Sequence, residues 1–367
     1  MSIKGIIMVE KEYKILTINP GSTSTKIAVY ENEQELFRKT IDHDLEELSK
    51  YKVVADQLPL RKQAILDCLK VMNFSLAQLA AVSGRGGGGL PPVKKGAYRV
   101  NPVMVDQLVH RNYSDHASNL GALLAYDIGN GLHIPAYIYD AVAVDELMDV
   151  ARLSGLPELP RVSRCHVLNM RAVALKVAEK MYKNVEELNI IVTHMGGGVT
   201  SSIINKGRLI DLIADDEGPY SPERAGRVQC RKLIDLCFSG KHNRWSATRR
   251  VKGEGGLVAY LGTNSALAVE EKIKNGDEYA KLVYYGMAYQ VAKGIGELAT
   301  VVNGKVDVII LTGAVAHSKM MTEWITERVS FIAPVEIMPG ENEMEALALG
   351  VLRVLRGQET ANEFVEN

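Results

Sequence analysis

The stretch NPGSTSTK at residues 19–26 lies between two short runs rich in β-forming residues, 14–18 and 26–30. This pattern predicts a β-hairpin with a wide loop full of hydroxyl groups. Backbone N–H groups, hydroxyls and one lysine within these residues are the donors and the cation that a polyphosphate requires. The alternative is a solvated turn, which is the commoner fate of a single Ser/Thr/Gly-rich stretch.

A later segment repeats this arrangement. Residues 189–193 predict a buried strand, 194–200 a glycine-rich turn and 201–204 a returning strand. In both segments a strand is followed by a polar residue, a glycine, a cluster of hydroxyls and a second strand. The repeat indicates an internal duplication and favours phosphate binding by both hairpins.

Length and composition indicate two globular domains. The chain has 367 residues, of which 47% are hydrophobic, and this exceeds one ordinary core. A net charge of −1 gives no field for nucleic acid or an anionic membrane. The apolar run at residues 6–9 is too short for a signal peptide or a membrane helix. Four scattered cysteines lack any metal-binding spacing. We therefore expect a soluble, cytoplasmic protein that acts on small molecules, without nucleic-acid or membrane partners.

Periodicity predicts that helices and strands alternate along the chain. We expect helices at residues 58–72, 102–111, 117–128, 281–300 and 343–356, and further strands at 79–83, 136–140 and 306–311. Asn101 and Pro102 would be the N-cap and first residue of the second of these helices. No low-complexity linker is present, so we expect the two domains to be tightly joined, with a cleft between them.

The glycine run GRGGGG at residues 84–89 formally matches a dinucleotide fingerprint. Such a fingerprint must open a helix, yet Leu-Pro-Pro follows at residues 90–92. We interpret Arg85 as the functional residue, a guanidinium on a flexible, exposed backbone, and a plain glycine loop is an equal alternative. No P-loop or protein-kinase signature is present.

Further candidates are an arginine loop and three histidines. The proline-framed loop at residues 219–227 presents Arg224, which suits the charge of a transferring phosphoryl group, although most such arginines only solubilise a surface. His116, His166 and His194 lie at element boundaries. Taken singly, such histidines are more often structural than catalytic.

In combination, these motifs resemble the acetate and butyrate kinase family, and within it the butyrate kinases most. The matching strings are INPGSTSTK (18–26), GRGG (84–87), DHASNLGALLAYDIG (115–129), HMGGG (194–198), EGPYSPERAG (217–226), EGGLVAYLGTN (254–264), MAYQVAK (287–293) and PGENEMEALALG (339–350). They occur in order over nearly the whole chain.

The resemblance implies an α/β fold with two duplicated ribonuclease-H-like domains of the acetate kinase, sugar kinase, Hsp70 and actin superfamily. It implies an N-terminal domain at residues 1–147, joined by the C-terminal segment 343–367, and a nucleotide-binding domain at 148–342. The nucleotide cleft would lie between them. A homodimer or a higher homo-oligomer is also implied.

The resemblance also implies ATP-dependent, reversible phosphorylation of a short-chain fatty acid by direct in-line transfer, with butyrate giving butanoyl phosphate. The alternative acids are isobutyrate, acetate and propionate. The implied cofactors are ATP or ADP and Mg²⁺. Small residues at Gly87 and Cys165 would widen the acyl pocket and favour butyrate or branched acids.

Roles follow for individual residues from the same resemblance. The implied catalytic residues are Arg85, His166, Arg224, Asp140 and His116. The implied nucleotide-binding residues are Asn19, Ser22, Ser24, Lys26, His194, Gly196, Gly197, Gly198, Thr312, Gly313 and Ala314. Asn19 and Glu343 would hold the metal, with Glu345 as the alternative to Glu343.

The chemistry of the acceptor fits these residues. A carboxylate with a pKa of about 4 is already ionised at neutral pH, so the transfer needs no general base. It needs cations that reduce the repulsion between two anions, here Mg²⁺, Arg85, Arg224 and His166. Three alternatives remain: a kinase of this fold with an alcohol acceptor, a non-enzymatic ATP-binding module, and a dinucleotide enzyme.

Overall fold

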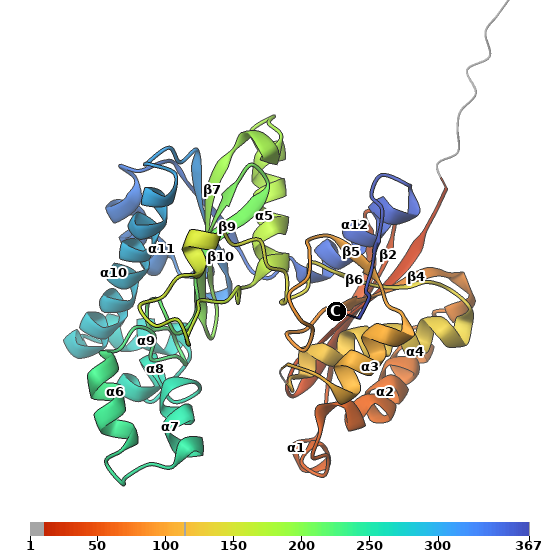
Figure 1. The fold of residues 1–367 in the computed structure, drawn as a ribbon, viewed down its shortest axis with the longest axis horizontal. Helices are drawn as coiled ribbons and strands as arrows, with labels where there is room; N and C mark the ends of the chain where they lie inside the picture. Colours follow the sequence, from red (N-terminus) through yellow and green to blue (C-terminus); the bar gives the residue numbers. More distant parts are fainter. Residues whose placement is uncertain (1–10, 114, 367) are drawn as a thin grey trace, which may run out of the picture. The chain divides into compact units, whose positions relative to one another are not determined.

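The computed structural model describes residues 11–113 and 115–366. The chain forms two compact units, one made of residues up to 143 together with those from 343 onward, and the other of residues 144–342 (Figure 1). The first unit is therefore built from two segments of the chain that are far apart in sequence.

A seven-stranded sheet organises the first unit, in the order β12-β5-β6-β4-β1-β2-β3. Its strands are β1 (Lys14–Pro20), β2 (Ser24–Glu31), β3 (Gln34–Asp42), β4 (Leu79–Arg85), β5 (Ala97–Arg99), β6 (Ala136–Tyr139) and β12 (Asn362–Glu363). Its helices are α1 (Leu45–Leu48), α2 (Leu58–Val71), α3 (Pro102–His110), α4 (Leu120–Leu132) and α12 (Glu343–Leu355), with 3₁₀ turns η1 (Val54–Gln57), η2 (Leu76–Gln78) and η3 (Ala117–Asn119).

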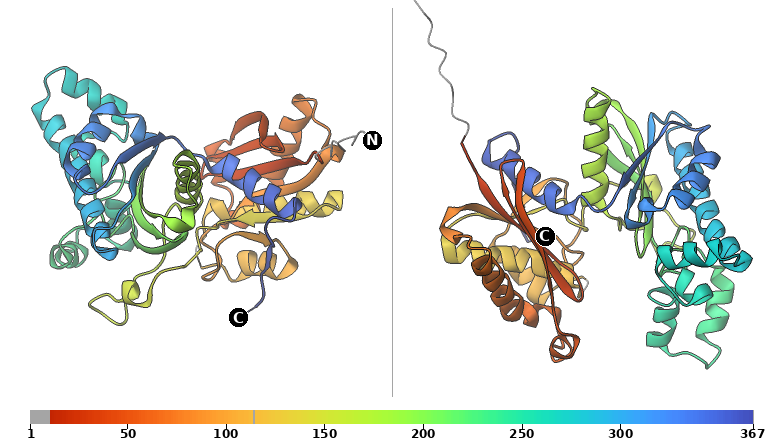
Figure 2. Two further views of the ribbon diagram at one scale, coloured as in Figure 1. Left: turned by 90° about the horizontal axis from the view of Figure 1, so that it is seen from above. Right: turned by 180° about the vertical axis from the view of Figure 1, so that it is seen from behind.

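Helices cover both faces of this sheet, as the views in Figures 1 and 2 show. Helix α12 packs on the face that carries Ile15, Ala81 and Tyr137, through Val351 and Leu352. Helix α4 packs against β4 and β6 on the opposite face. Because strand side chains alternate between faces, each buried strand supplies both layers of the core.

The second unit contains a five-stranded sheet, in the order β11-β10-β7-β8-β9. Its strands are β7 (Asn189–Met195), β8 (Val199–Asn205), β9 (Arg208–Ile213), β10 (Val308–Gly313) and β11 (Val335–Pro339). Its helices are α5 (Val167–Lys180), α6 (Cys230–Cys237), α7 (Arg244–Val251), α8 (Gly256–Leu261), α9 (Ala266–Lys274), α10 (Glu278–Val301) and α11 (Lys319–Val329), with 3₁₀ turns η4 (Asp149–Arg152), η5 (Val185–Glu187) and η6 (Ala314–His317).

Five strands of the first sheet, β6-β4-β1-β2-β3, share the topology of the second sheet, which confirms the predicted duplication. In each, three antiparallel strands follow one another, β1-β2-β3 and β7-β8-β9. The next strand of the sheet, β4 or β10, runs parallel to the first strand of the hairpin, and another parallel strand follows it, β6 or β11. The long helices and strands expected from periodicity are all present.

Two details of the predicted hairpins are wrong. Asn19 pairs with Lys26 across β1 and β2, and Gly21 N–H donates to Ser24 O at 2.8 Å, so the loop is tight and not wide. In the second hairpin His194 pairs with Thr200, and only residues 196–198 form the turn. In both hairpins, the first and last residues of the predicted loop therefore belong to the paired strands.

The glycine run after β4 is a packing feature rather than a flexible loop. A Cβ atom at Gly84 would lie 1.9 Å from the carbonyl oxygen of Gly121, and one at Gly121 would lie 2.3 Å from that of Arg85. The backbones of β4 and α4 thus touch directly. The expectation that Arg85 lies on flexible, exposed backbone is wrong, because Gly84 and Gly86 on either side of it are buried.

We expect Gly84→Ala to lower the free energy of unfolding by about 2 kcal/mol, because the new methyl group must force α4 away from β4. Gly131→Ala is the matched control. Gly131 lies in α4, the helix that Gly84 contacts, and no atom lies within 4 Å of its Cβ position. This substitution should be neutral or stabilising by about 0.5–1 kcal/mol. Urea unfolding measures both, and equal stability of the two variants would contradict the close contact.

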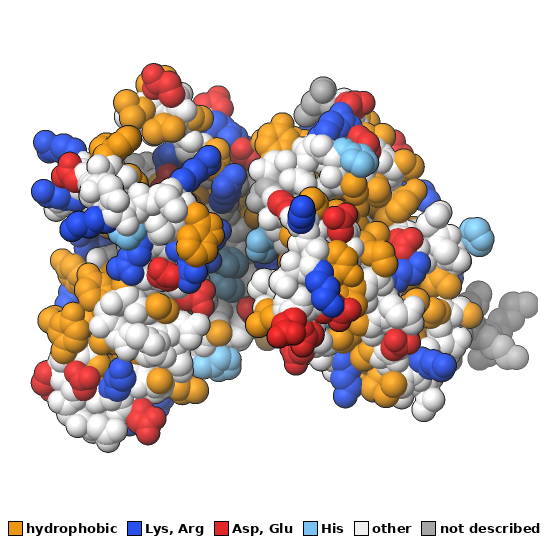
Figure 3. All heavy atoms as spheres, turned by 90° about the horizontal axis from the view of Figure 1, so that it is seen from below, with side chains coloured by type: hydrophobic (Ala, Val, Ile, Leu, Met, Phe, Trp, Pro, Cys, Tyr) orange, Lys and Arg blue, Asp and Glu red, His pale blue; other side chains and the backbone are white. Residues whose placement is uncertain are grey.

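Basic, acidic and apolar side chains are interspersed over the face of each unit drawn in Figure 3. Nowhere in residues 11–113 and 115–366 does a helix combine the length and apolarity needed to cross a bilayer.

Candidate active site

The ends of three parallel strands carry predicted site residues of the first unit. Asn19 lies near the end of β1, Arg85 is the last residue of β4, and Asp140 directly follows β6. These strands are neighbours in the sheet and run in the same direction. Their carboxyl ends therefore meet at one edge, where ligands of open α/β sheets usually bind.

At this edge Asn19, Arg85 and Glu343 form a hydrogen-bonded triangle. Asn19 Nδ2 donates to Glu343 Oε2 at 2.6 Å, and Arg85 Nη1 donates to the same oxygen at 3.0 Å. Arg85 Nη1 also donates to Asn19 Oδ1 at 3.3 Å. The Glu343 side chain is only 4% exposed, and a buried carboxylate needs such partners. Of the two glutamates considered, Glu343 is the one that makes these contacts.

Asp140 is buried and takes a backbone conformation that is unusual for a residue other than glycine. Its φ is 41°, in the left-handed region. Its Oδ1 accepts a hydrogen bond from Gly96 N–H at 2.9 Å, and its own N–H donates to Gly96 O at 3.2 Å. The carboxylate therefore fastens the start of β5 to the end of β6.

His116 lies on the surface of the first unit and caps η3. Its Nδ1 accepts from Ser118 N–H at 3.2 Å and lies 2.9 Å from Ser118 Oγ. Since Nδ1 accepts the backbone N–H, the neutral ring carries its proton on Nε2.

In the second unit two predicted histidines stack on each other. The rings of His166 and His194 lie 3.9 Å apart, with 12° between their planes. His166 directly precedes α5, and its Nδ1 lies 2.8 Å from Thr200 Oγ1. The stack joins the start of α5 to the β7–β8 hairpin.

Asn169 connects this pair to the end of β10, and sequence reasoning missed it. Its Nδ2 lies 2.9 Å from His194 Nδ1 and 3.2 Å from Thr312 Oγ1. Its Oδ1 accepts from Asn342 N–H at 2.8 Å. Asn169 follows His166 by one helical turn, which is the only signal that the sequence offers. It holds the predicted histidine and adenosine segments in one network.

The predicted adenosine turn follows β10. Gly313 has φ of 89°, and a Cβ atom there would lie 2.4 Å from the carbonyl oxygen of Met195. Only glycine fits this close approach. Thr312 is buried and pairs with His194 across the sheet, whereas Ala314 begins η6 and is exposed.

Arg224 lies against the glycine turn at residues 196–198. Ser221 Oγ donates to Gly197 O at 2.6 Å and accepts from Arg224 N–H at 3.0 Å. The Arg224 guanidinium donates through Nε to Asp215 Oδ2 at 3.0 Å, and Nη1 lies 3.5 Å from Glu223 Oε2. Two carboxylates therefore orient this arginine.

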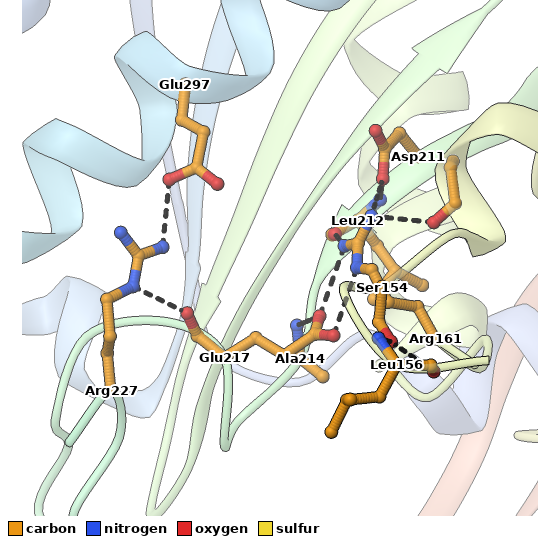
Figure 4. A network of polar contacts seen from close by, with 10 residues as sticks. Ser154, Leu156, Arg161, Asp211, Leu212, Ala214, Glu217, Arg227 and Glu297 are labelled. Carbon is orange, nitrogen blue, oxygen red and sulfur yellow. Dashed lines mark hydrogen bonds and ion pairs between the residues drawn. The ribbon is translucent and has the colours of Figure 1, made fainter. Parts of the chain in front are cut away.

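Figure 4 shows a network of ion pairs and hydrogen bonds around Ala214 and Glu217. The turn between these two residues contains Asp215. Arg161 Nε donates to Glu217 Oε1 and Nη1 donates to Asp211 Oδ1, each at 3.0 Å. On the other side Arg227 Nε donates to Glu217 O at 2.8 Å. Sequence reasoning missed Asp215 and Glu217, because nothing local distinguishes them from surface carboxylates.

Comparison with known proteins identifies the family of the chain. The model of the acetokinase family matches residues 164–346. Butyrate kinase 2 of Clostridium acetobutylicum is 50% identical over 355 residues, covering 96% of this chain and 99% of the relative. This chain belongs to the acetokinase family.

Solved structures of acetokinase proteins share its fold. Acetate kinase from Porphyromonas gingivalis superposes with a TM-score of 0.79 at 18% identity, covering 94% of this chain and 100% of the other. A propionate kinase from Francisella tularensis gives 0.75 at 16% identity, covering 92% and 98%. At such identities the likeness concerns the fold alone, and it confirms the predicted acetokinase architecture.

Asn19 and Glu343 of the first unit are the predicted Mg²⁺ ligands. Within the described part of the chain, no three His, Cys, Asp or Glu side chains gather in a way that could hold a metal ion. Mg²⁺ typically binds one or two carboxylates together with substrate phosphates and water. The carboxylate of Glu343 beside the amide of Asn19 fits that requirement once a nucleotide supplies the remaining oxygens.

Proposed function

We propose that the chain is a butyrate kinase that uses ATP and Mg²⁺. A carboxylate oxygen of butyrate attacks the γ-phosphorus of ATP in line, the bond from that phosphorus to the β–γ bridging oxygen breaks, and butanoyl phosphate and ADP leave. The reaction is reversible because an acyl phosphate is itself a high-energy donor. The observation that supports the proposal most is the 50% identity to a butyrate kinase over nearly the full length of both chains.

Each site residue has a proposed role in this reaction. Arg85 and Arg224 bind the acid's carboxylate and the transferring phosphoryl group, and His166 stabilises the transition state, because positive charge must offset the repulsion between two anions. The remaining residues are proposed to act as follows: His116 as a second active-site histidine, Asp140 as an organiser of water near the metal, Asn19 and Glu343 as Mg²⁺ ligands, and Ser22, Ser24, Lys26, His194, Gly196, Gly197, Gly198, Thr312, Gly313 and Ala314 as nucleotide contacts.

Further proposals concern organisation in the cell. We propose two functional domains, residues 1–147 with 343–367 and residues 148–342, and a cytoplasmic homodimer or higher homo-oligomer. The oligomeric state can be checked by light scattering.

Hydroxamate trapping tests the activity. With ATP, Mg²⁺ and butyrate, hydroxylamine should trap butanoyl phosphate as the hydroxamate in step with ADP release. ADP release that depends on an added alcohol and not on butyrate would indicate an alcohol acceptor, and ATP binding without ADP release in either case would indicate a non-enzymatic ATP-binding module. Binding of NAD(H) instead of ATP would indicate a dinucleotide enzyme.

A panel of acids with two to five carbons, including isobutyrate, tests the acyl preference. We expect kcat/KM to change by only about fourfold per methylene, because one buried methylene contributes about 0.8 kcal/mol. Higher kcat/KM for acetate than for butyrate and isobutyrate would contradict a preference for longer acids. A wider pocket at Gly87 does not explain that preference, because a Cβ atom there would lie 2.1 Å from Asn119 Oδ1. Cys165 is likewise packed inside, and its burial raises the pKa of the thiol to about 12.

We expect Asn169→Ala to lower kcat/KM roughly tenfold, because buried His194 and the backbone N–H of Asn342 each lose their hydrogen bond to Asn169. Asn184→Ala is the control, since Asn184 only caps the exposed turn η5. Steady-state assays of both variants with ATP and butyrate give the comparison. Wild-type kinetics in Asn169→Ala would exclude Asn169 from the site.

A further inference from the structure

One guanidinium holds the β1–β2 turn from inside the first unit. Arg61 is fully buried, with 0% exposure. Its Nη1 donates to Gly21 O at 2.9 Å and to Ser24 O at 3.0 Å, and lies 3.1 Å from Thr25 Oγ1. Its Nη2 donates to Ser22 O at 3.0 Å. The side chain thus binds almost every residue of the turn that we propose for phosphate.

Arg61 reaches this turn from the buried face of α2. That face otherwise carries Ile65 and Leu69, so an arginine there is expensive unless its donors are satisfied. Its Nε donates to Gln57 Oε1 at 3.0 Å, so each of the three guanidinium nitrogens donates a hydrogen bond. The position of the turn is therefore fixed relative to α2 as well as to the sheet.

These contacts also determine which way the backbone N–H groups of the turn point. In a planar trans peptide the C=O of one residue and the N–H of the next point in opposite directions. Since the carbonyls of Gly21 and Ser22 face Arg61, the N–H groups of Ser22 and Thr23 face away from it. In residues 11–113 and 115–366 these two N–H groups donate to no other group of the protein. Adjacent outward N–H groups form a concavity that binds anions.

The charge of Arg61 also lacks a protein counter-ion. None of the carboxylates that the structure describes pairs with Arg61, whose oxygen partners are all neutral. Burial lowers the pKa of its guanidinium to about 10, so it stays charged at neutral pH. A buried cation of this kind favours an anion nearby. An anionic ligand on the outer surface of the turn would supply one.

We propose that Arg61 is a positioning residue for the nucleotide's polyphosphate. It does not touch the nucleotide. It turns the N–H groups of Ser22 and Thr23 outward and places an uncompensated positive charge beneath them. This inference rests on the proposed function, because it requires that ATP binds at this turn.

Calorimetric titration with Mg²⁺–ATP and with adenosine tests the proposal in three variants. Arg61→Met removes the hydrogen-bond donors and keeps a long apolar side chain. Arg61→Lys keeps the positive charge but loses the planar guanidinium with its several donors. Arg38→Met is the control, because Arg38 is an exposed arginine of the same sheet. We expect the Kd for ATP to rise roughly tenfold in Arg61→Met and about threefold in Arg61→Lys, while the Kd for adenosine stays the same. The KM for ATP should rise similarly, and the KM for butyrate should not.

The outcomes separate this inference from the proposed function. If the wild-type protein binds no ATP, the proposed function itself is wrong. If it binds ATP and Arg61→Met binds ATP equally well, the inference is overturned. Equal losses for ATP and adenosine would reduce Arg61 to general structural support, which also overturns it. If thermal unfolding shows that Arg61→Met does not fold, Arg61→Lys decides by the same ratio of ATP to adenosine affinity.

Discussion

Arg85→Ala should lower kcat about 10³-fold, with little change in the Kd for adenosine. Arg85 is partly exposed and hydrogen-bonded to both Asn19 and Glu343, so its guanidinium is held in place before any substrate arrives. A preorganised donor that meets developing negative charge contributes about 10²–10³ in kcat. The upper end applies here because the substitution also leaves the buried carboxylate of Glu343 without its cation.

The design includes variants that separate these two effects. Arg99→Ala is the control, because Arg99 is an exposed arginine of the same sheet. Arg85→Ala combined with Glu343→Gln removes the uncompensated carboxylate, and a double-mutant cycle with the two single variants then gives the coupling between the two side chains. If Arg85→Ala turns over as fast as Arg99→Ala, Arg85 has no part in the transfer.

Arg224→Ala should lower kcat by roughly 10², the scale expected when one transition-state donor is lost. Asp215 and Glu223 hold the Arg224 guanidinium beside the glycine turn, so its orientation does not depend on substrate. Because part of its charge is already balanced by these carboxylates, we expect a smaller effect than at Arg85. Single-turnover kinetics with saturating ATP and butyrate measure the chemical step directly.

Two companion variants support the interpretation of Arg224. Arg224→Lys retains the charge but not the planar fork, and its rate should lie between the wild type and the alanine variant. Arg250→Ala removes an exposed arginine of α7 and serves as the control. Near-wild-type turnover in Arg224→Ala would remove Arg224 from the mechanism.

The duplicated architecture was predictable because its signals are local. Strand alternation, the two glycine-bearing hairpins and the helix boundaries all depend on neighbouring residues. Asn101 illustrates this, since its Oδ1 accepts from Met104 N–H at 2.9 Å as the N-cap pattern predicts. The wide loop failed because β-pairing between Asn19 and Lys26 extends further than turn-forming residues suggest.

The supporting residues of the candidate site were not predictable in the same way. Asn169 contacts Thr312 across 143 positions, and Asn19 contacts Glu343 across 324. Arg61 lies on the buried face of α2, whereas a charged residue in a helix usually indicates a solvent-exposed face. The sequence identified the groups suited to phosphate and carboxylate chemistry, whereas the contacts that orient them arise only from packing between distant segments.

The place of α12 in the first unit has a consequence for biosynthesis. When a ribosome has synthesised the chain only as far as residue 342, the nascent chain still lacks α12, the helix that covers one face of the first sheet. It also lacks Glu343. The first domain to emerge therefore cannot finish folding before the second has been translated, contrary to the usual order in multidomain chains. We therefore expect copies truncated before residue 343 to be inactive, because the first unit would lack α12 and Glu343.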